Sequence, residues 1–598
     1  MTEKKIIGIY FDDHKSEHQN NVDFSAIATY ALQFNNVAAL WNSNDFSLKD
    51  YSNVVAKIKE KKINQLIIAG DKPGFVKTFF VKAMVTAGNN SEDVILASFR
   101  EFGAVKKTDT DCAKAIIFCA INNVPYVTAA TPKETDVNPD TLVIGGGIAG
   151  IQASLEIADS GKKVFLVERT GSIGGHMAMF DKTFPTLDCA ACILTPKMVE
   201  VGQHNNIDLM SYCEVKSISG IAGNFKVTIL QKARKVNIAK CIGCGICAEK
   251  CPASVPSEFD ANTTMRKAIY MPFPQAVPNK YLIDAENCTY IKTGKCKICV
   301  KFCPVDGCID LDEKDREVEI NVGNIVVATG FKIFDAKRDE RFGYGKFPNV
   351  VTSLEFERLV NASGPTGGNI TYRTQDKKGN WIFTQESGTP KSFALIHCIG
   401  SRDNNYNKYC SKVCCMYTLK LAHLITEKFH DAEVYEYFID MRAFGKGYEE
   451  FYERIRQEGV HIIRGRTAKV EEKKNKLLIR GEDILEDKLI EKDVDMVILS
   501  VGLEPREDAS NIAKMLGIKQ GDDGWFDEEN YISNPVNTTT GGISIAGVCQ
   551  GPKDIPDTVA QASAAASRVI QSILNGKIQK GIKDITLSEI ETNAKSID

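Results

Sequence analysis

One stretch of the sequence limits the fold more than any other. Residues 241–252 read CIGCGICAEKCP, which is a C-x2-C-x2-C-x3-C-P run. In such a run, three close thiolates bind irons of one [4Fe–4S] cluster, and the fourth cysteine serves a second cluster. A partner run is therefore required, and the chain supplies one with Cys288, Cys296, Cys299 and Cys303, followed by Pro304.

The pairing rule for two such runs divides the eight cysteines between two clusters. One set is Cys241, Cys244, Cys247 and Cys303, and the other is Cys288, Cys296, Cys299 and Cys251. This is the bacterial ferredoxin pattern, stretched after Cys288 by the insertion TYIKTGK. Zinc binding is the alternative, but a zinc site does not need a doubled run that ends in proline. Cys308 remains unassigned, and we interpret it as structural.

Charge and hydropathy exclude several classes of protein. The 77 acidic and 74 basic residues nearly balance, so nothing favours nucleic acid or an anionic membrane as a partner. No apolar run approaches the roughly 18 residues of a membrane span. The apolar run near the N-terminus ends after about six residues, which is too short for a signal peptide. We therefore expect a cytoplasmic protein, in which most of the 19 cysteines serve metal or redox chemistry.

The first part of the chain alternates strand and helix patterns. Short apolar runs at 6–11, 37–41, 65–70 and 94–99 predict buried strands, with helical patterns between them. This order predicts an open parallel sheet. The polar segment PKETDVNPD (132–140) predicts a linker.

A dinucleotide-binding motif follows that linker. VIGGGIAG places Gly145, Gly147 and Gly150 as GxGxxG directly after a predicted strand and before a helix. The first glycine allows a tight turn, the second lets a pyrophosphate approach, and the third lets the helix pack on the strand. Glu168 ends the next strand, where an acid binds ribose hydroxyls.

Three later segments resemble the two-dinucleotide-binding flavoproteins, the family of thioredoxin reductase. They are RTGSIGG (169–175), VVATGF (326–331) and ISIAGVCQGP (543–552) with the helix after it. The resemblance implies FAD, bound by residues that include Arg169, Gly174, Gly175, Thr329, Gly330, Gly547 and Gln561. The second nucleotide module of that family would begin near residue 391, but there SFALIHC runs into IGSRDNN without a glycine fingerprint. A nicotinamide cofactor is therefore not expected.

Cys189 and Cys192 form a CxxC pair at the start of a predicted helix, where thiol pKa values are lowered. Three interpretations stay open: a flavin-coupled redox pair, a structural pair near the flavin, and cluster ligation. Cys410, Cys414 and Cys415, with Cys398 twelve residues earlier, form the last group. A third cubane cluster, reactive thiols and ordinary buried cysteines are all open for them.

The order of all these motifs resembles the A subunit of heterodisulfide reductase. The resemblance covers about residues 140–575 and includes FDKTFPTLDCAACILTPKM, HCIGSRD, YCSKVCCMYTLK and AGVCQGPKDIPDTVAQASAAA. It implies that Cys398, Cys410, Cys414 and Cys415 hold one unusual [4Fe–4S] cluster. It also implies that Lys420 lies near the flavin ring and tunes it, where composition alone favours a solvated helix residue. Two family features are missing: the N-terminal cluster cysteines and a terminal ferredoxin domain.

We therefore predict an α/β fold: an N-terminal open parallel-sheet domain, then a two-dinucleotide-binding (thioredoxin reductase-like) flavoprotein core with an inserted bacterial-type 2[4Fe–4S] ferredoxin domain. The predicted segments are the N-terminal domain (1–135), three parts of the FAD-binding domain (136–236, 314–390 and 501–576), the ferredoxin domain (237–313), a second nucleotide-binding-like domain that carries the unusual cluster (391–500) and a polar tail (577–598).

The resemblance implies an oxidoreductase with FAD and three [4Fe–4S] clusters. It would be the electron-bifurcating or confurcating subunit of a heterodisulfide reductase-like complex. Expected partners are subunits of the B and C types, an electron-donor module and ferredoxin, in a hetero-oligomer or a dimer of protomers. Two alternatives are a quinone-linked relay subunit of a sulfur-metabolism complex and a stand-alone NAD(P)H-dependent flavin disulfide reductase.

Overall fold

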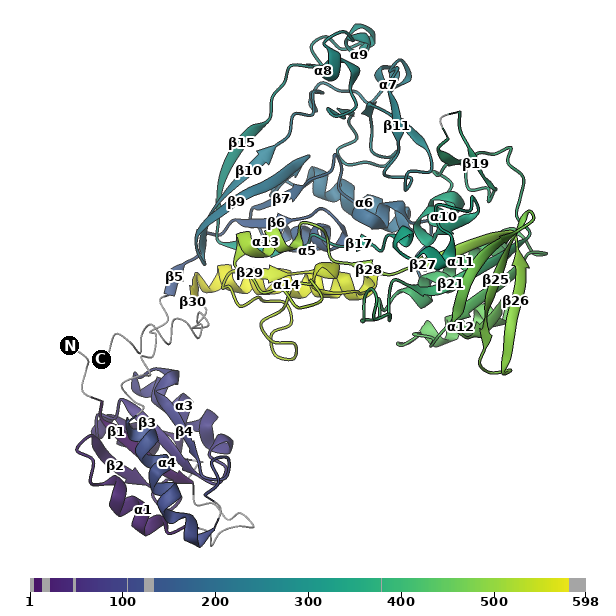
Figure 1. The fold of residues 1–598 in the computed structure, drawn as a ribbon. Coiled ribbons are helices and arrows are strands. Elements are labelled where there is room, and N and C mark those ends of the chain that lie inside the picture. Colours follow the sequence, from purple (N-terminus) through teal and green to yellow (C-terminus); the bar gives the residue numbers. More distant parts are fainter. Residues whose placement is uncertain are drawn as a thin grey trace. The chain divides into compact units, whose positions relative to one another are not determined.

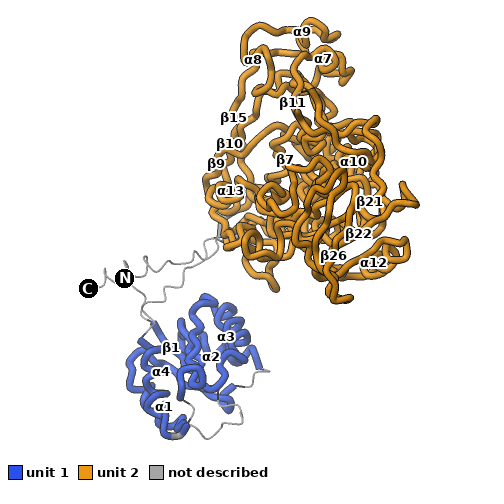
Figure 2. The backbone as a smooth tube through the Cα atoms, turned by 45° about the vertical axis from the view of Figure 1, so that its right-hand side comes forward, with its two compact units in different colours: residues 1–133 blue, residues 134–598 orange. Residues whose placement is uncertain are grey.

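The computed structural model describes residues 5–12, 22–46, 50–104, 106–122, 134–377 and 379–579. The chain divides into two compact units, residues 1–133 and 134–598 (Figure 2). The first unit is a four-stranded parallel sheet in the order β2-β1-β3-β4. Its strands are β1 (Ile7–Asp12), β2 (Val37–Trp41), β3 (Gln65–Gly70) and β4 (Val94–Ser98), which confirms the four predicted strands.

Helices cover both faces of this sheet because side chains alternate along each strand. Ile7 and Ile9 of β1 pack with α1 (Phe24–Ala31) and α4 (Thr110–Asn122) on one face. Tyr10 packs on the other face with α2 (Tyr51–Glu60) and α3 (Gly74–Ala87). The unit is thus a small α/β domain with a core on each side of its sheet.

The second unit is built on two five-stranded parallel sheets (Figure 1). The first has the order β29-β16-β6-β7-β8, and the first of its helices, α5 (Ile148–Asp159), packs against the long helix α14 (Ile555–Asn575). An antiparallel sheet of β9 (Cys213–Ile221), β10 (Asn224–Gln231) and β15 (Arg316–Val322) lies next to it in the chain. The strands of the first sheet are β6 (Thr141–Ile144), β7 (Val164–Glu168), β8 (Ile207–Ser211), β16 (Asn324–Val327) and β29 (Ile543–Ile545).

The second sheet has the order β18-β27-β21-β22-β23. Its core packs against α10 (Ser353–Val360), α11 (Cys414–Lys428) and α12 (Tyr448–Gln457). A three-stranded antiparallel sheet of β24 (Thr467–Lys473), β25 (Lys476–Asp483) and β26 (Lys488–Val494) is appended to it. The strands of the second sheet are β18 (Val350–Thr352), β21 (Ser392–Ile399), β22 (Glu433–Phe438), β23 (His461–Arg464) and β27 (Met496–Val501).

The segment that contains the ferredoxin runs leaves β10 and returns in β15, so it is an insertion between paired strands. Its helices are very short: α7 (Ile246–Glu249), α8 (Thr289–Thr293) and α9 (Ile298–Phe302). Two small hairpins join β11 (Ser254–Pro256) to β12 (Met265–Lys267) and β13 (Ile269–Tyr270) to β14 (Leu282–Ile283). With so little regular structure, this segment depends on other groups to fix its fold.

Two predicted boundaries differ from the structure. Strand β18 and helix α10 belong to the second sheet, so that module begins near Val350 rather than at residue 391. A three-residue strand is too short to give a periodic signal. At the other end, Lys577–Gln579 form β30 and pair with β5 (Glu134–Asp136), although 577–598 was expected to be a tail and 132–140 a linker. The rest of the expected tail lies outside the described residues.

Candidate functional site

A cavity of about 840 Å³ lies at the carboxyl ends of the strands of the first sheet. Ligands bind to open parallel sheets at this edge, and the volume suits a large cofactor. The cavity is lined by residues from β6, β7, α10, α11 and the segment 546–558. Most of the predicted dinucleotide residues lie on its wall: Gly145, Gly147, Glu168, Arg169, Gly175, Thr329 and Gly330.

The glycines of the motif have distinct environments. A Cβ on Gly145 would lie 2.4 Å from Ala328 O, and a Cβ on Gly150 would lie 1.8 Å from Gly145 O, so both positions exclude a side chain. A Cβ on Gly147 would meet no protein atom within 4 Å, and this residue faces the cavity. The turn is thus packed against the sheet behind it and open toward the cavity, as a phosphate-binding turn requires.

The other predicted residues support the wall from behind. Gly150, Gly174, Gly547 and Gln561 do not line the cavity. Gln561 Oε1 accepts a hydrogen bond of 2.8 Å from Gly547 N, which ties α14 to the turn at its start. Glu168 accepts hydrogen bonds from the backbone N–H of Gly146 (2.7 Å) and of Thr170 (2.8 Å), which fix its carboxylate at the cavity edge.

The inserted segment also contributes to the cavity wall, which the sequence did not predict. Phe259, Arg266, Tyr270 and Phe273 line the cavity, although they lie between the two cysteine runs. Phe259 and Phe273 stack with ring centroids 4.7 Å apart. No periodic pattern marks these residues, because the hairpins around them are two or three residues long.

A buried ion pair lies at the opposite wall. Lys420 Nζ donates to Glu357 Oε2 at 2.5 Å and to Lys182 O at 3.1 Å, and Lys420 is 3% exposed. Glu357 Oε1 in turn accepts from Asp181 N at 2.7 Å. Lys420 is therefore not a solvated helix residue. It is the buried cation of the cavity wall, and Glu357 is a partner that the sequence analysis missed.

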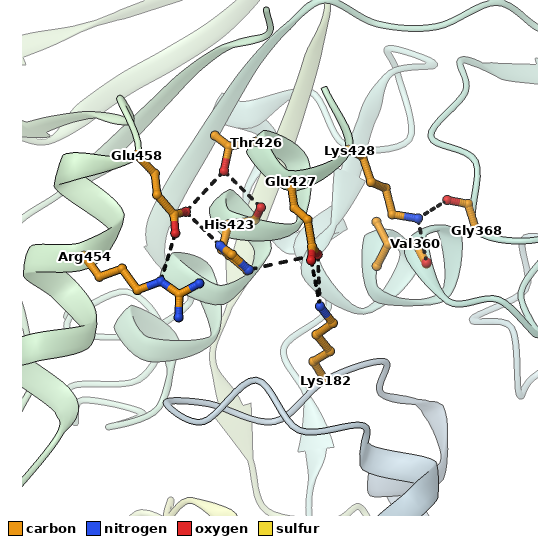
Figure 3. A network of polar contacts seen from close by, with 9 residues as sticks. All are labelled: Lys182, Val360, Gly368, His423, Thr426, Glu427, Lys428, Arg454 and Glu458. Carbon is orange, nitrogen blue, oxygen red and sulfur yellow. Dashed lines mark hydrogen bonds and ion pairs between the residues drawn. The ribbon is translucent and has the colours of Figure 1, made fainter. Parts of the chain in front are cut away.

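Helix α11 carries a second polar network on the side away from the cavity (Figure 3). His423 Nδ1 lies 2.7 Å from Glu458 Oε2, and Glu458 Oε1 accepts from Arg454 Nε at 3.0 Å. Glu427 pairs with Lys182 at 2.9 Å, so the chain before Cys189 is attached to α11 a second time. These contacts fix the helix that carries Lys420.

Two further groups line the cavity without a sequence signal. The His176 ring stacks on Phe331 with centroids 4.2 Å apart, and burial lowers the pKa of His176 to about 4. Lys553 precedes α14 and donates to Gly547 O (2.8 Å) and Gly551 O (2.9 Å). Burial lowers the pKa of Lys553 to about 8.

The ferredoxin cysteines are grouped as the pairing rule predicts. Cys241, Cys244, Cys247 and Cys303 surround one small hollow. In the other set, burial raises the pKa of Cys299 to about 11, and the charges of Cys288, Cys251 and Cys296 raise it further. Cys308 is buried against the first hollow. Among the described residues, no three Cys, His, Asp or Glu side chains converge on a point where one metal ion would bind.

The last group of cysteines also surrounds a hollow. Cys398, Cys410, Cys414 and Cys415 line it together with two cations, Arg402 and Lys412. Cys414 and Cys415 form the first turn of α11, and Cys398 lies in β21 with a φ of 59°. The adjacent cysteines thus point into one space, and four thiols beside two cations suit an anionic iron–sulfur cluster. The hollow occupies the end of β21, where a nucleotide fingerprint would otherwise be.

Cys189 and Cys192 differ from the other cysteines, because they are joined by a disulfide. Cys189 caps α6 (Ala190–Gln203), and the Cys192 N–H donates to its sulfur at 3.2 Å. Both residues are exposed, and neither lines the cavity.

Comparisons with known proteins agree with this geometry. The model of FAD-dependent oxidoreductases matches residues 140–182, and that of 4Fe–4S binding domains matches residues 234–257. The A-type subunit of the H(2):CoB-CoM heterodisulfide,ferredoxin reductase of Methanothermobacter marburgensis is 42% identical over 97% of this chain and 86% of its own length. The chain belongs to the family of heterodisulfide reductase A subunits. Its H(2)/formate-named relative from Methanococcus maripaludis is 43% identical over 95% of this chain and 85% of its own length.

Membership of this heterodisulfide reductase family makes the chain an oxidoreductase with FAD and iron–sulfur cofactors. Among solved structures, the thioredoxin reductase of Lactococcus lactis covers 73% of this chain and 100% of its own at 13% identity, with a TM-score of 0.39. In the part of the chain that the structure describes, no helix is long and apolar enough to cross a membrane.

Proposed function

We propose that the chain is the electron-distributing subunit of a heterodisulfide reductase-like complex. In this role it takes electrons from a donor module and divides them between ferredoxin and a disulfide-reducing partner, or runs the same exchange in reverse. The printed names of relatives, which join a heterodisulfide and ferredoxin in one reductase, support this assignment.

One observation carries the proposal: a single helix joins the cavity to the third group of thiols. Cys414 and Cys415 begin α11, and Tyr417 and Lys420, within its next two turns, line the cavity. The Tyr417 hydroxyl donates to Val501 O at 2.6 Å, and Val501 lies on the cavity wall. The thiol hollow and the cavity therefore share a wall, which is the arrangement that short-range electron transfer needs.

The cavity fits FAD, and we assign its residues accordingly. Gly145 and Gly147 would admit the pyrophosphate, Glu168 would bind ribose hydroxyls, and Thr329 and Gly330 would close the site. Bound there, FAD exchanges electrons in pairs on one side and singly on the other. The aromatic rings of Phe180, His176 and Phe331 exclude water from this wall, which strengthens the field of any nearby charge.

Lys420 has the electrostatic role in this proposal. Its ammonium group is desolvated, and one carboxylate, Glu357, balances it. A cation so placed favours negative charge on a ligand at the same wall. Glu357 and Lys182 O are positioning groups, because they hold the ammonium group without lying between it and the hollow at Cys414.

We assign three [4Fe–4S] clusters to the described thiols. Two lie in the insertion, and the third is held by Cys398, Cys410, Cys414 and Cys415. Because the insertion lines the cavity through Phe259 and Tyr270, and α11 lines it from another side, two separate electron routes meet there. Two routes are what the chain needs to send single electrons to two acceptors.

The complex purified from native cells tests this function. The donor module should drive the reduction of ferredoxin and of the disulfide acceptor together, and omission of either acceptor should stop reduction of the other. The isolated chain should not bleach its flavin with NADH alone, because the second nucleotide fingerprint is missing. Rapid bleaching by NADH, reduction of each acceptor without the other, or reduction of a quinone in place of ferredoxin would overturn the proposal.

A further inference from the structure

We propose that Cys189 and Cys192 are a thiol–disulfide exchange site for a protein dithiol of the thioredoxin class, and that the state of this pair reaches Lys420 through residues 181–190. The exchange reaction stands on the geometry of the cysteines alone. Only its effect on the flavin rests on the proposed function.

The disulfide is placed for a reaction with an external partner. Both cysteines are exposed, and Ile193, directly after the second one, exposes 40% of its surface. Neither sulfur lines the cavity, so the electrons for this pair come from outside the chain rather than from the flavin site. An exposed disulfide beside an apolar side chain suits docking by a protein dithiol.

The position at the start of α6 sets the direction of exchange. The helix has 14 residues, and Cys189 is its N-cap, with the Cys192 N–H directed at the Cys189 sulfur. Partial positive charge at a helix start stabilises a thiolate there. Cys189 is therefore the better leaving group, because disulfides open fastest when the departing thiol has a low pKa.

The reaction balances as two successive exchanges. A thiolate of the partner attacks Cys192 Sγ, a mixed disulfide forms, and the Cys189–Cys192 bond breaks with its electron pair on Cys189 Sγ. The second partner thiolate then displaces Cys192 Sγ. The chain gains two electrons and two protons as two thiols, and the partner dithiol becomes a disulfide.

A short hairpin connects this pair to the cavity. Lys182 and Cys189 face each other as an antiparallel bridge. The Ala190 N–H donates to Asp181 O at 3.0 Å, and the Thr183 N–H donates to Asp188 O at 2.8 Å. The limb 181–183 is thus hydrogen-bonded to the limb that contains the first cysteine.

The same limb holds both members of the buried ion pair. The Asp181 N–H donates to Glu357, and Lys182 O accepts from Lys420. The Lys182 side chain reaches Glu427 on α11, as Figure 3 shows. A shift of the Cys189 limb therefore changes the contacts of Lys420 through one hairpin of ten residues.

Opening the disulfide removes the covalent link between the hairpin and the first turn of α6. The limb 181–183 then loses part of its support, and Lys420 loses the fixed position of one of its two acceptors. With Lys182 O less available, the ammonium group turns further toward the cavity. Reduction should therefore raise the midpoint potential of the bound flavin, since a nearby cation favours added electrons.

The full chain with its cofactors is the material for the test. It is incubated with a thioredoxin kept reduced by dithiothreitol, or with the same low concentration of dithiothreitol alone. Alkylation with peptide-resolved mass spectrometry then reports the two cysteines, hydrogen exchange reports residues 180–190, and a redox titration reports the flavin. Cys189→Ser and Cys192→Ser are compared with Cys112→Ser/Cys119→Ser, which removes two exposed thiols of the first unit.

We expect Cys189 and Cys192 to be protected until thioredoxin is added, and then to be labelled several times faster than with dithiothreitol alone. Residues 180–190 should exchange faster afterwards, and the flavin potential should rise in the reduced chain and in both single variants, but not in the control. Labelling without any reductant would overturn the exchange site. An unchanged flavin potential and unchanged exchange at 180–190 after full reduction would overturn the coupling, whether or not the proposed function holds.

Discussion

Lys420 Nζ lies 2.5 Å from Glu357 Oε2, and the two side chains are 3% and 5% exposed. Neither group touches bulk water, so each depends on the other for compensation of its charge. The pair joins α11, which carries two cysteines of the third thiol group, to α10, which contacts the chain before Cys189. It therefore lies where the flavin site, the thiol hollow and the exposed disulfide meet.

Glu357→Gln should destabilise the chain by about 3 kcal/mol, because it leaves a buried ammonium group without a counter-charge. Urea unfolding measures this change, and the flavin absorption spectrum should shift as well. Glu427→Gln is the matched control, since Glu427 pairs with a lysine at the surface, where a pair contributes less than about 1 kcal/mol. Equal losses in the two variants would contradict the role given to burial.

Arg358→Met should loosen the insertion. The Arg358 guanidinium is fully buried, and it donates to Asp260 Oδ1 at 3.1 Å and to Met179 O at 3.0 Å. Its removal leaves both acceptors unpaired and should cost about 3 kcal/mol. Limited proteolysis should then cut within 237–313 sooner than in Arg456→Met, which breaks only a surface pair with Glu453. Equal rates of cleavage would show that Arg358 does not anchor the insertion.

Gly147→Ala separates folding from cofactor binding. Gly147 has φ −75° and no protein atom within 4 Å of a new Cβ, so alanine fits the protein without strain. The methyl group would instead occupy the space where a pyrophosphate approaches. The variant should unfold at the same urea concentration without FAD, yet bind FAD at least tenfold more weakly. Gly74→Ala, equally open but at the start of α3, should change neither quantity.

His176 should make stability fall in acid. Its pKa is about 4 in the folded chain against 6.5 when unfolded, so between these values only the unfolded chain binds the proton. The stability from burial of the neutral ring is present above pH 6.5 and is lost as the pH falls toward 4. In His176→Phe the loss between pH 7.5 and 5.5 should be smaller by about 1 kcal/mol.

The control for that variant is His461→Phe, because His461 also stacks on an aromatic ring, Tyr435, but lies at the surface. Unfolding free energies at the two pH values, measured for all three chains, separate titration of His176 from the loss of a stacked ring. A His176→Phe chain with the same pH dependence as the unaltered chain would contradict the assignment.

The sequence predicted those parts of the molecule that local rules determine. The four strands of the first unit, the turn at Gly145 and Gly147 and the grouping of the eight ferredoxin cysteines all follow from period or spacing. Glu357, His176 and the aromatic residues of the insertion could not be predicted, because they reach the cavity only after distant segments pack together. The module boundary near Val350 was placed too late, since β18 has three residues and no readable pattern.

Iron and flavin content, measured in the anaerobically purified chain and in Cys415→Ser, tests the central claim most directly. The account predicts one FAD and about twelve irons in the unaltered chain, from three cubane clusters. Cys415→Ser should retain FAD and fall to about eight irons. About eight irons in both chains would contradict the account, because the hollow formed by Cys398, Cys410, Cys414 and Cys415 would then hold no cluster beside the flavin.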